Sequence, residues 1–161
     1  MSILEKYKEI FSIVGSIISI FSLFLFVPAM VGLYYSEAVW KLFLFLGVVN
    51  FSLGIFIFIT CKKIILNSTR SRELQPRDGL LLVLLVWISL SSIASLPFYF
   101  HDSNLHPIKA IFEAVSGLTT TGATIYSGLD QMPKAILIWR AILQWLGGMG
   151  ILFGEGRISI P

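Results

Sequence analysis

Three long stretches of this sequence contain no Asp, Glu, Lys or Arg, and they limit the folds that the chain can adopt. The stretches are residues 10–36, 42–61 and 79–101. A helix rises about 1.5 Å per residue, so ~20 apolar residues are enough to cross the ~30 Å hydrocarbon core of a bilayer. A fourth apolar stretch, residues 135–153, is broken only by Arg140 and Gln144. The pattern predicts an all-α integral membrane protein.

Composition supports the same class, because apolar residues are 56% of the chain and charged residues only 13%. Soluble domains carry roughly 25% charged residues. The first nine residues mix Glu5 and Glu9 with Lys6 and Lys8, which is unlike the basic start of a cleaved signal peptide. We therefore expect the first apolar stretch to be a retained anchor helix.

Basic residues are concentrated between the second and third predicted spans. They are Lys62, Lys63, Arg70, Arg72 and Arg77. The positive-inside rule places this connection and the N-terminus in the cytoplasm. Topology and attraction to anionic lipids account for the basic excess, so we expect a lipid bilayer and no nucleic acid as the partner.

Two residues predict local features of these spans. Pro28 lies near the outer end of the first span, where a kink is tolerated. Asp78 directly precedes the third apolar stretch and is expected to be the N-cap of that helix.

A short helix is predicted between the third and fourth spans, beginning at Pro107 and stopping at Gly117. Its apolar residues recur at helical spacing, but it is too short to cross a membrane. We expect the chain to turn back through residues 119–124 as a re-entrant loop, which must be buried in protein or line a water-filled cavity. The carbonyl end of such a helix favours a cation.

These residues make up a recognisable pattern. The segments FEAVSGLTTTGAT (residues 112–124), WRAILQWLGGMGI (139–151) and RELQPRDGLLLV (72–83) resemble the first pore unit of the Trk/Ktr potassium-uptake transporters. The similarity is to their TrkH-type membrane subunit, and it covers about residues 1–151. It implies a two-helix hairpin followed by one span–re-entrant pore loop–span unit, as in potassium channels.

With this resemblance, the chain divides into four predicted units. They are a transmembrane hairpin (1–61), a cytoplasmic basic loop (62–78), a first pore unit (79–153) and a divergent C-terminal tail (154–161).

The resemblance also assigns an ion path. Residues 120–122 look like the counterpart of the Thr-Val-Gly filter of potassium channels, so the carbonyls of Thr119, Thr120, Thr121 and Gly122 are expected to line it. Potassium would be held by the backbone carbonyls of the last three. Glycine at position 122 suits the unusual dihedral angles of a filter, although a turn glycine is the alternative.

Two ionisable residues are expected to support this filter. Glu113 lies at membrane depth, where such residues are costly and usually functional or paired, and we expect it to accept hydrogen bonds behind the filter. Arg140 needs a partner within the fourth span, and either Glu113 or a carbonyl near the filter would serve. The small residues 147–150 are expected to allow close helix packing, with hinge motion as the alternative.

No constellation typical of an enzyme is present in the sequence. There is no HExxH pattern and no nucleotide-binding loop, and His101 and His106 are expected at the surface rather than on a metal. Cys61 is the single cysteine, so no intrachain disulfide can form. We expect neither enzymatic activity nor a cofactor, with the potassium ion as the substrate.

The family pattern differs from this sequence in two respects. Its members hold four span–loop–span units, whereas this chain holds one, and the resemblance is lost after Ile151. The expectation is a truncated potassium-uptake subunit of the bacterial inner membrane. It would need copies of itself, or the remaining pore units, around the ion. A cytoplasmic nucleotide-binding regulatory subunit is a further possible partner. The alternatives are a non-transporting membrane fragment and a small interaction protein that associates with a full-length transporter.

Overall fold

The computed structural model describes residues 3–65, 76–102 and 105–155, and it describes side chains over 7–61, 78–102 and 105–149. Every regular element in these ranges is helical. The elements are α1 (Ile3–Leu23), α2 (Phe26–Tyr34), α3 (Trp40–Ile65), α4 (Pro76–His101), α5 (Pro107–Leu118), the 3₁₀ helix η1 (Leu129–Gln131) and α6 (Lys134–Glu155). Of the predicted basic loop (62–78), residues 62–65 belong to α3 and residues 76–78 to α4, so the helices extend into both of its ends. Residues 66–75 of this loop and 156–161 of the predicted C-terminal tail lie outside the described residues.

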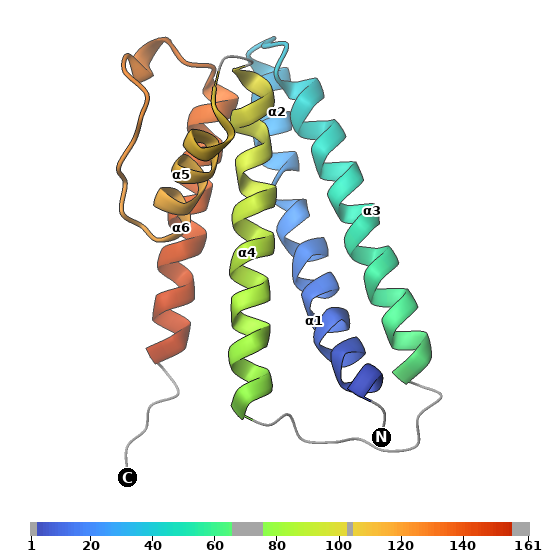
Figure 1. Cartoon of the computed structure of the whole chain (residues 1–161). Coiled ribbons are helices and arrows are strands. Elements are labelled where there is room, and N and C mark those ends of the chain that lie inside the picture. Colours follow the sequence, from blue (N-terminus) through green and yellow to red (C-terminus); the bar gives the residue numbers. More distant parts are fainter. Residues whose placement is uncertain (1–2, 66–75, 103–104, 156–161) are drawn as a thin grey trace.

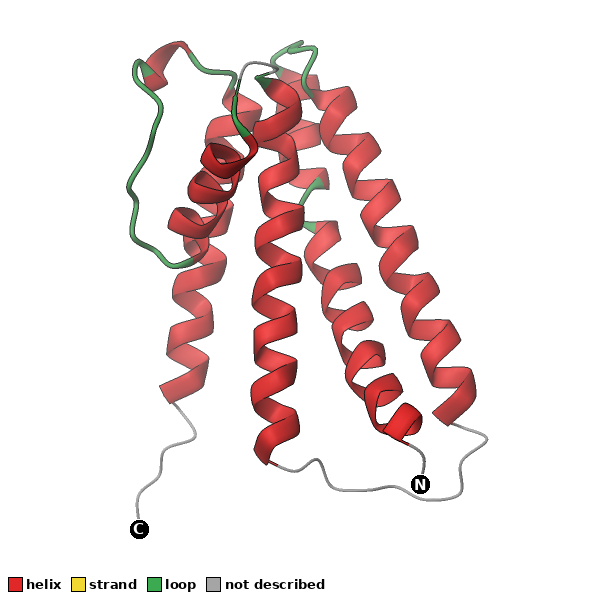
Figure 2. Ribbon diagram, viewed as in Figure 1, coloured by secondary structure: helices red, strands yellow, loops and turns green. Residues whose placement is uncertain are grey.

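The helices form two groups that lie side by side (Figure 1). Helices α1 and α2 follow one another along one side of the N-terminal hairpin, and both pack against the antiparallel helix α3. Helices α4, α5 and α6 form the second group, in which the short α5 packs against both longer helices. The start of α1 and the end of α6 lie at the same end of the molecule. Figure 2 shows a long loop between α5 and η1 that returns toward the opposite end.

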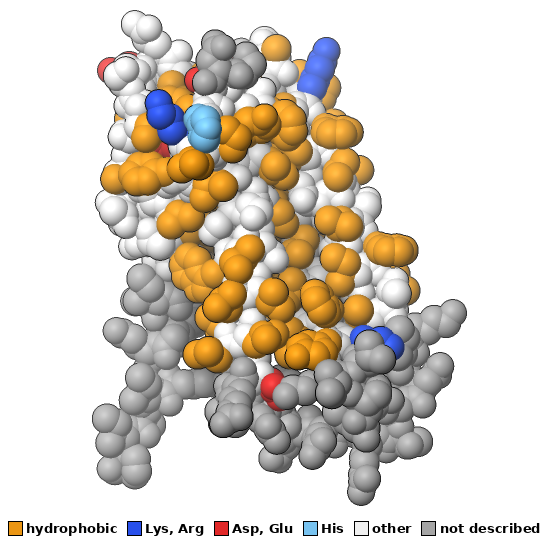
Figure 3. All heavy atoms as spheres, viewed as in Figure 1, with side chains coloured by type: hydrophobic (Ala, Val, Ile, Leu, Met, Phe, Trp, Pro, Cys, Tyr) orange, Lys and Arg blue, Asp and Glu red, His pale blue; other side chains and the backbone are white. Residues whose placement is uncertain are grey.

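Three segments of the described chain are long and apolar enough to cross a membrane. They are Tyr7–Tyr34, Trp40–Cys61 and Asp78–His101. These match the first three predicted spans. The fourth predicted span forms α6, whose last residues lie beyond the described side chains. Figure 3 shows hydrophobic side chains over much of the visible helical surface, with charged side chains near its two ends.

The structure refines one local prediction and corrects another. The break expected near Pro28 lies one turn before it, at Phe24 and Leu25. Proline cannot donate to the carbonyl four residues earlier and its ring clashes with that carbonyl, which is that of Phe24. Asp78 is not the N-cap, because α4 already begins at Pro76 and places Asp78 in its first turn. A carboxylate there still complements the positive end of the helix.

The two groups of helices meet at Trp139 of α6, which is fully buried. Its indole Nε1 donates to the carbonyl of Ala94 in α4 at 3.0 Å. Its ring also makes edge-on contacts with Phe21 of α1 and Phe43 of α3, at centroid distances of 5.8 and 6.1 Å. This side chain therefore joins the hairpin to the helices that carry the predicted filter.

Candidate functional site: the end of α5 and the loop that follows

The chain leaves α5 through a Schellman motif, a hydrogen-bond pattern with which many helices end. The amide of Thr121 donates to the carbonyl of Ser116 at 3.0 Å. The amide of Thr120 donates to the carbonyl of Gly117 at 2.9 Å. This motif requires one left-handed residue, usually glycine, and here it is Thr120 with φ of 58°. For a β-branched residue that conformation costs on the order of 1–3 kcal/mol.

The amides on either side of this pair also donate to carbonyls in the last turns of α5. The amide of Thr119 donates to the carbonyl of Val115 at 2.8 Å, and that of Gly122 lies 3.3 Å from the carbonyl of Ser116. Four successive amides are therefore used by the end of α5. In the part of the chain that the structure describes, the carbonyls of residues 119–122 accept no hydrogen bond, and these residues are exposed.

Gly122 adopts φ of 73°, in the left-handed region that glycine reaches without penalty. A Cβ at this position would meet only the side-chain nitrogen Nε2 of Gln144, at 3.6 Å. The backbone angle, rather than a lack of space, therefore requires glycine here. The run of free carbonyls ends at the next residue, because the hydroxyl of Ser116 donates to the carbonyl of Ala123 at 2.6 Å.

The threonine side chains are partly used within the same turn. The hydroxyl of Thr119 donates to the carbonyl of Val115 at 2.8 Å and lies 2.9 Å from the hydroxyl of Thr121. The threonine hydroxyls therefore form hydrogen bonds at the end of the helix. This bonding leaves the main-chain oxygens as the unused acceptors of the turn.

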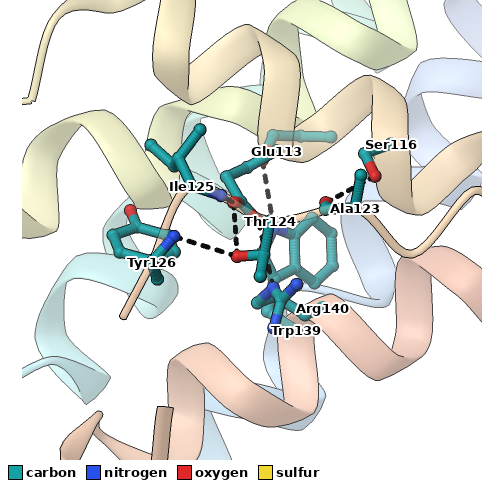
Figure 4. Close-up of polar contacts among 9 residues, drawn as sticks. Glu113, Ser116, Ala123, Thr124, Ile125, Tyr126, Trp139 and Arg140 are labelled. Atoms are coloured by element: carbon teal, nitrogen blue, oxygen red, sulfur yellow. Dashed lines mark hydrogen bonds and ion pairs between the residues drawn. The ribbon is translucent and has the colours of Figure 1, made fainter. Parts of the chain in front are cut away.

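A buried carboxylate holds the part of the loop that follows (Figure 4). Glu113 projects from α5, and its side chain is fully buried. One of its oxygens accepts from the hydroxyl of Thr124 and from the amide of Ile125, both at 2.6 Å. The hydroxyl of Thr124 in turn accepts from the amide of Tyr126 at 3.1 Å. Three consecutive residues are thus tied to one side chain.

The other oxygen of Glu113 meets Arg140. The guanidinium Nε of Arg140 in α6 lies 3.1 Å from this oxygen, and the arginine side chain is 15% exposed. Of the two partners left open by the sequence, the structure brings the carboxylate to the arginine. Because each is removed from water, the pair is costly to break from one side only.

Two glycines bring α6 against the end of α5. A Cβ on Gly147 would collide with the carbonyl oxygen of Leu118. A Cβ on Gly117 would lie 2.9 Å from the Cβ of Leu143. Gly147 thus has the packing role expected of the small residues, because its lack of a side chain lets α6 contact the backbone of Leu118, the last residue of α5.

Tyr126 is a residue that the sequence did not single out. Its hydroxyl is buried and has no hydrogen-bond partner among the described residues. Burial, together with the nearby charge of Glu113, raises the pKa of Tyr126 to about 12. The phenol therefore stays protonated at physiological pH. Sequence alone gave no signal for it beyond its place just after the threonine-rich turn.

The family is established by comparison with known proteins. A model of the TrkH family, described as a cation transport protein, matches residues 47–153 of this sequence. The chain belongs to the TrkH family. The sequence-based prediction of the family is confirmed, and so is that of an all-helical membrane protein.

Several named relatives share most of this chain. The Trk system potassium uptake protein TrkH of Vibrio parahaemolyticus is 41% identical over 150 residues, which are 91% of this chain. An uncharacterized cation transporter of Methanocaldococcus jannaschii is 34% identical over 148 residues. The crystal structure of the potassium transporter TrkH from Vibrio parahaemolyticus matches 90% of this chain with a TM-score of 0.78.

The chain spans under a third of the length of these relatives. It covers 29% of the Vibrio parahaemolyticus TrkH sequence and 30% of the chain in the crystal structure. The family match ends at residue 153, close to Ile151, where the resemblance in the sequence was lost.

Proposed function

We propose that this chain contributes the first pore unit of a Trk-type potassium-uptake system, and that residues 119–122 form part of its selectivity filter. One observation carries the proposal: the amides of these residues are turned into the end of α5 while their carbonyls remain unbonded. The names of the relatives, potassium uptake proteins, support potassium as the ion.

Potassium would be held at the backbone carbonyls of Thr120, Thr121 and Gly122, which would replace part of its hydration shell. The carbonyl end of α5 adds a partial negative charge on the same side. Glu113 and Arg140 would then act as supports, since they hold the returning loop and do not offer atoms to the ion. Transport of this kind needs no cofactor and changes no covalent bond.

One unit supplies carbonyls from one side only, so a complete filter needs further units. We propose that they come from copies of this chain or from the remaining units of a longer protein. The basic residues between the second and third spans support an N-terminus on the cytoplasmic side, and the bacterial relatives support a bacterial inner membrane. A nucleotide-binding regulatory subunit would act from that side.

Potassium uptake in a transport-deficient strain tests the proposal. The strain would express this chain alone, or together with the residues that the relatives have beyond it. Restored growth at low potassium in either case supports the proposal. Absence of rescue in both, with the protein present in the membrane, would contradict it and favour a non-transporting fragment or an interaction protein.

Selectivity tests the filter assignment within a conducting assembly. Gly122→Ser places a Cβ on a residue with φ of 73° and should disturb the neighbouring carbonyls. We expect the preference for potassium over sodium to fall while Gly128→Ser, another glycine with positive φ but with open space around it, leaves the preference unchanged. Equal selectivity in both variants would contradict the assignment.

A further inference from the structure

The outer turn of the N-terminal hairpin reaches the pore unit through Glu37. This residue lies between α2 and α3, and its two carboxylate oxygens accept from the amides of Lys134 at 2.6 Å and Ala135 at 3.0 Å. These amides begin α6, almost 100 positions later in the chain. A helix begins with amides that lack partners within the helix, so an external acceptor here caps α6.

The remaining amides of this helix start are also satisfied. Those of Ile136 and Leu137 donate to the carbonyl of Pro133, at 3.0 and 3.2 Å. The hairpin side chain and one proline carbonyl therefore account for the first four amides of α6. A carboxylate at a helix N-terminus also interacts favourably with the helix dipole. Glu37 thus fixes the beginning of α6 by both hydrogen bonds and charge.

The turn that carries Glu37 is itself held against α6. The amide of Glu37 donates to the carbonyl of Gly32 at 2.8 Å. A Cβ on Gly32 would lie 3.1 Å from the Cβ of Trp40 and 3.3 Å from that of Ala135, so the turn and α6 approach closely at this glycine. Ser36, next to Glu37, adopts φ of 56°. The carboxylate is therefore presented from a defined backbone rather than from a loose loop.

The next turn of α6 connects this cap to the loop. Ala135, Ile136 and Trp139 are fully buried, and Trp139 contacts α1, α3 and α4 as described above. Arg140 follows Trp139 directly and pairs with Glu113. A rotation or shift of the first turns of α6 would therefore move the arginine relative to the carboxylate that holds the loop.

We propose that Glu37 is a positioning residue for the predicted filter loop. The hairpin, through this carboxylate, sets where α6 begins, and α6 sets where Arg140 meets Glu113 and hence how Thr124 and Ile125 are held. For ion selectivity the proposal rests on the proposed function, whereas the mechanical coupling can be measured without transport. The N-terminal hairpin then positions α6 and the filter loop, in addition to anchoring the chain in the membrane.

Hydrogen–deuterium exchange of the protein in nanodiscs tests the coupling. In Glu37→Ala we expect exchange at the amides of Lys134 and Ala135 to rise about fivefold, the equivalent of a helix cap worth ~1 kcal/mol. The amide of Ile125, which does not contact Glu37, should show a smaller increase in the same direction. Water can replace the lost carboxylate at this half-buried position, so the helices should stay folded.

Two further variants sharpen this result. Asp130→Ala removes an exposed carboxylate from η1, just before α6, and should change exchange at none of these amides. Glu37→Gln keeps one acceptor oxygen but loses the charge, so its effect should be intermediate. Faster exchange confined to Lys134 and Ala135, with Ile125 unchanged in Glu37→Ala, would reduce Glu37 to a local cap and overturn the proposal.

Transport separates this inference from the proposed function. In an assembly that conducts, Glu37→Ala should lower potassium-over-sodium selectivity, Glu37→Gln should recover part of it, and Asp130→Ala should leave it unchanged. If no assembly conducts but Ile125 responds in exchange, the positioning role stands and the proposed function fails. If an assembly conducts with selectivity unaffected by Glu37→Ala, the positioning role fails and the proposed function stands.

Discussion

Helices α1 and α3 of the N-terminal hairpin are held by close backbone contact, whereas the loop after α5 is held by hydrogen bonds to a buried carboxylate. In the hairpin, Gly15 and Gly54 face each other so closely that a Cβ on either would lie within 3 Å of the backbone of the other helix. Lipid supplies no hydrophobic driving force between such helices, so close packing takes its place.

Polar side chains show the same difference. Ser19 and Ser22 donate to carbonyls of their own helix, at 2.9 and 2.7 Å, and Asn50 of α3 does likewise at 2.8 Å. In α5, by contrast, Glu113 and Ser116 bond residues of the loop that follows. The hairpin should therefore be sensitive to side-chain size and tolerant of polar exchange, whereas the loop should be sensitive to the loss of its polar contacts.

Removal of the carboxylate of Glu113 should have the largest effect. Glu113→Ala leaves Arg140 without its partner and frees Thr124 and Ile125, so we expect the free energy of unfolding to fall by about 3–5 kcal/mol. Reversible unfolding in mixed micelles would measure it. Lys109→Ala, on the exposed side of α5, serves as the control. A cost near that of the control would show that hydrogen bonding does not hold this loop.

Gly147→Ala should come next. The added Cβ meets the carbonyl oxygen of Leu118, which is backbone and cannot move away cheaply, so α6 must separate from α5. Overpacking of this kind costs ~1–3 kcal/mol, and the rigid partner places this variant at the upper end. Gly148→Ala, where the nearest atom is a methyl of Thr120 at 3.9 Å, is the matched control. Equal thermal stability of the two variants would contradict the close approach.

Gly54→Ala tests the hairpin. Its Cβ would lie 2.5 Å from the hydroxyl of Ser19 and 2.8 Å from the carbonyl of Gly15, so we expect a loss of ~1–2 kcal/mol, lessened where the serine rotates. Ser22→Ala removes a fully buried hydroxyl that only bonds its own helix and should cost less. A larger effect for Ser22→Ala than for Gly54→Ala would reverse the comparison between the two regions.

Tyr126→Phe should have the smallest effect. It deletes a buried hydroxyl that has no partner among the described residues, so stability at pH 7 should be unchanged or slightly higher. The folded-state pKa of Tyr126 is raised to about 12, so the phenol destabilises the fold as pH rises from about 10 through 12. Melting curves at pH 7 to 12 should show a shallower alkaline decline in the variant. A clear loss of stability at pH 7 would reveal a partner for the hydroxyl.

Hydropathy alone was enough to predict the long helices, because a bilayer allows few alternatives for a long apolar segment. Pro28 predicted the break in the first span to within one turn, since proline acts on the carbonyl four residues earlier. Asp78 was assigned wrongly because the helix begins at Pro76, and a capping residue and a first-turn acid look alike in sequence.

The site could be predicted in part. Glu113 and Arg140 stand out because ionisable residues at membrane depth need partners, and the structure places them together. The left-handed Thr120 could not be predicted, since glycine is the usual residue of a Schellman motif. The contact from Glu37 to α6 gives no local signal either, because the two partners are far apart in the sequence.

Cysteine labelling in membrane vesicles tests the account most directly. Cys61→Ser removes the native thiol, and Thr121→Cys then reports on the turn after α5, with Asp130→Cys as an outer control. In a conducting assembly, we predict that an impermeant maleimide labels position 121 only from the outer side, and that potassium slows this labelling more than sodium. The control should label from the same side at a rate that is independent of the ion. Labelling of position 121 from the cytoplasmic side, or at a rate that potassium does not change, would contradict an ion-facing loop.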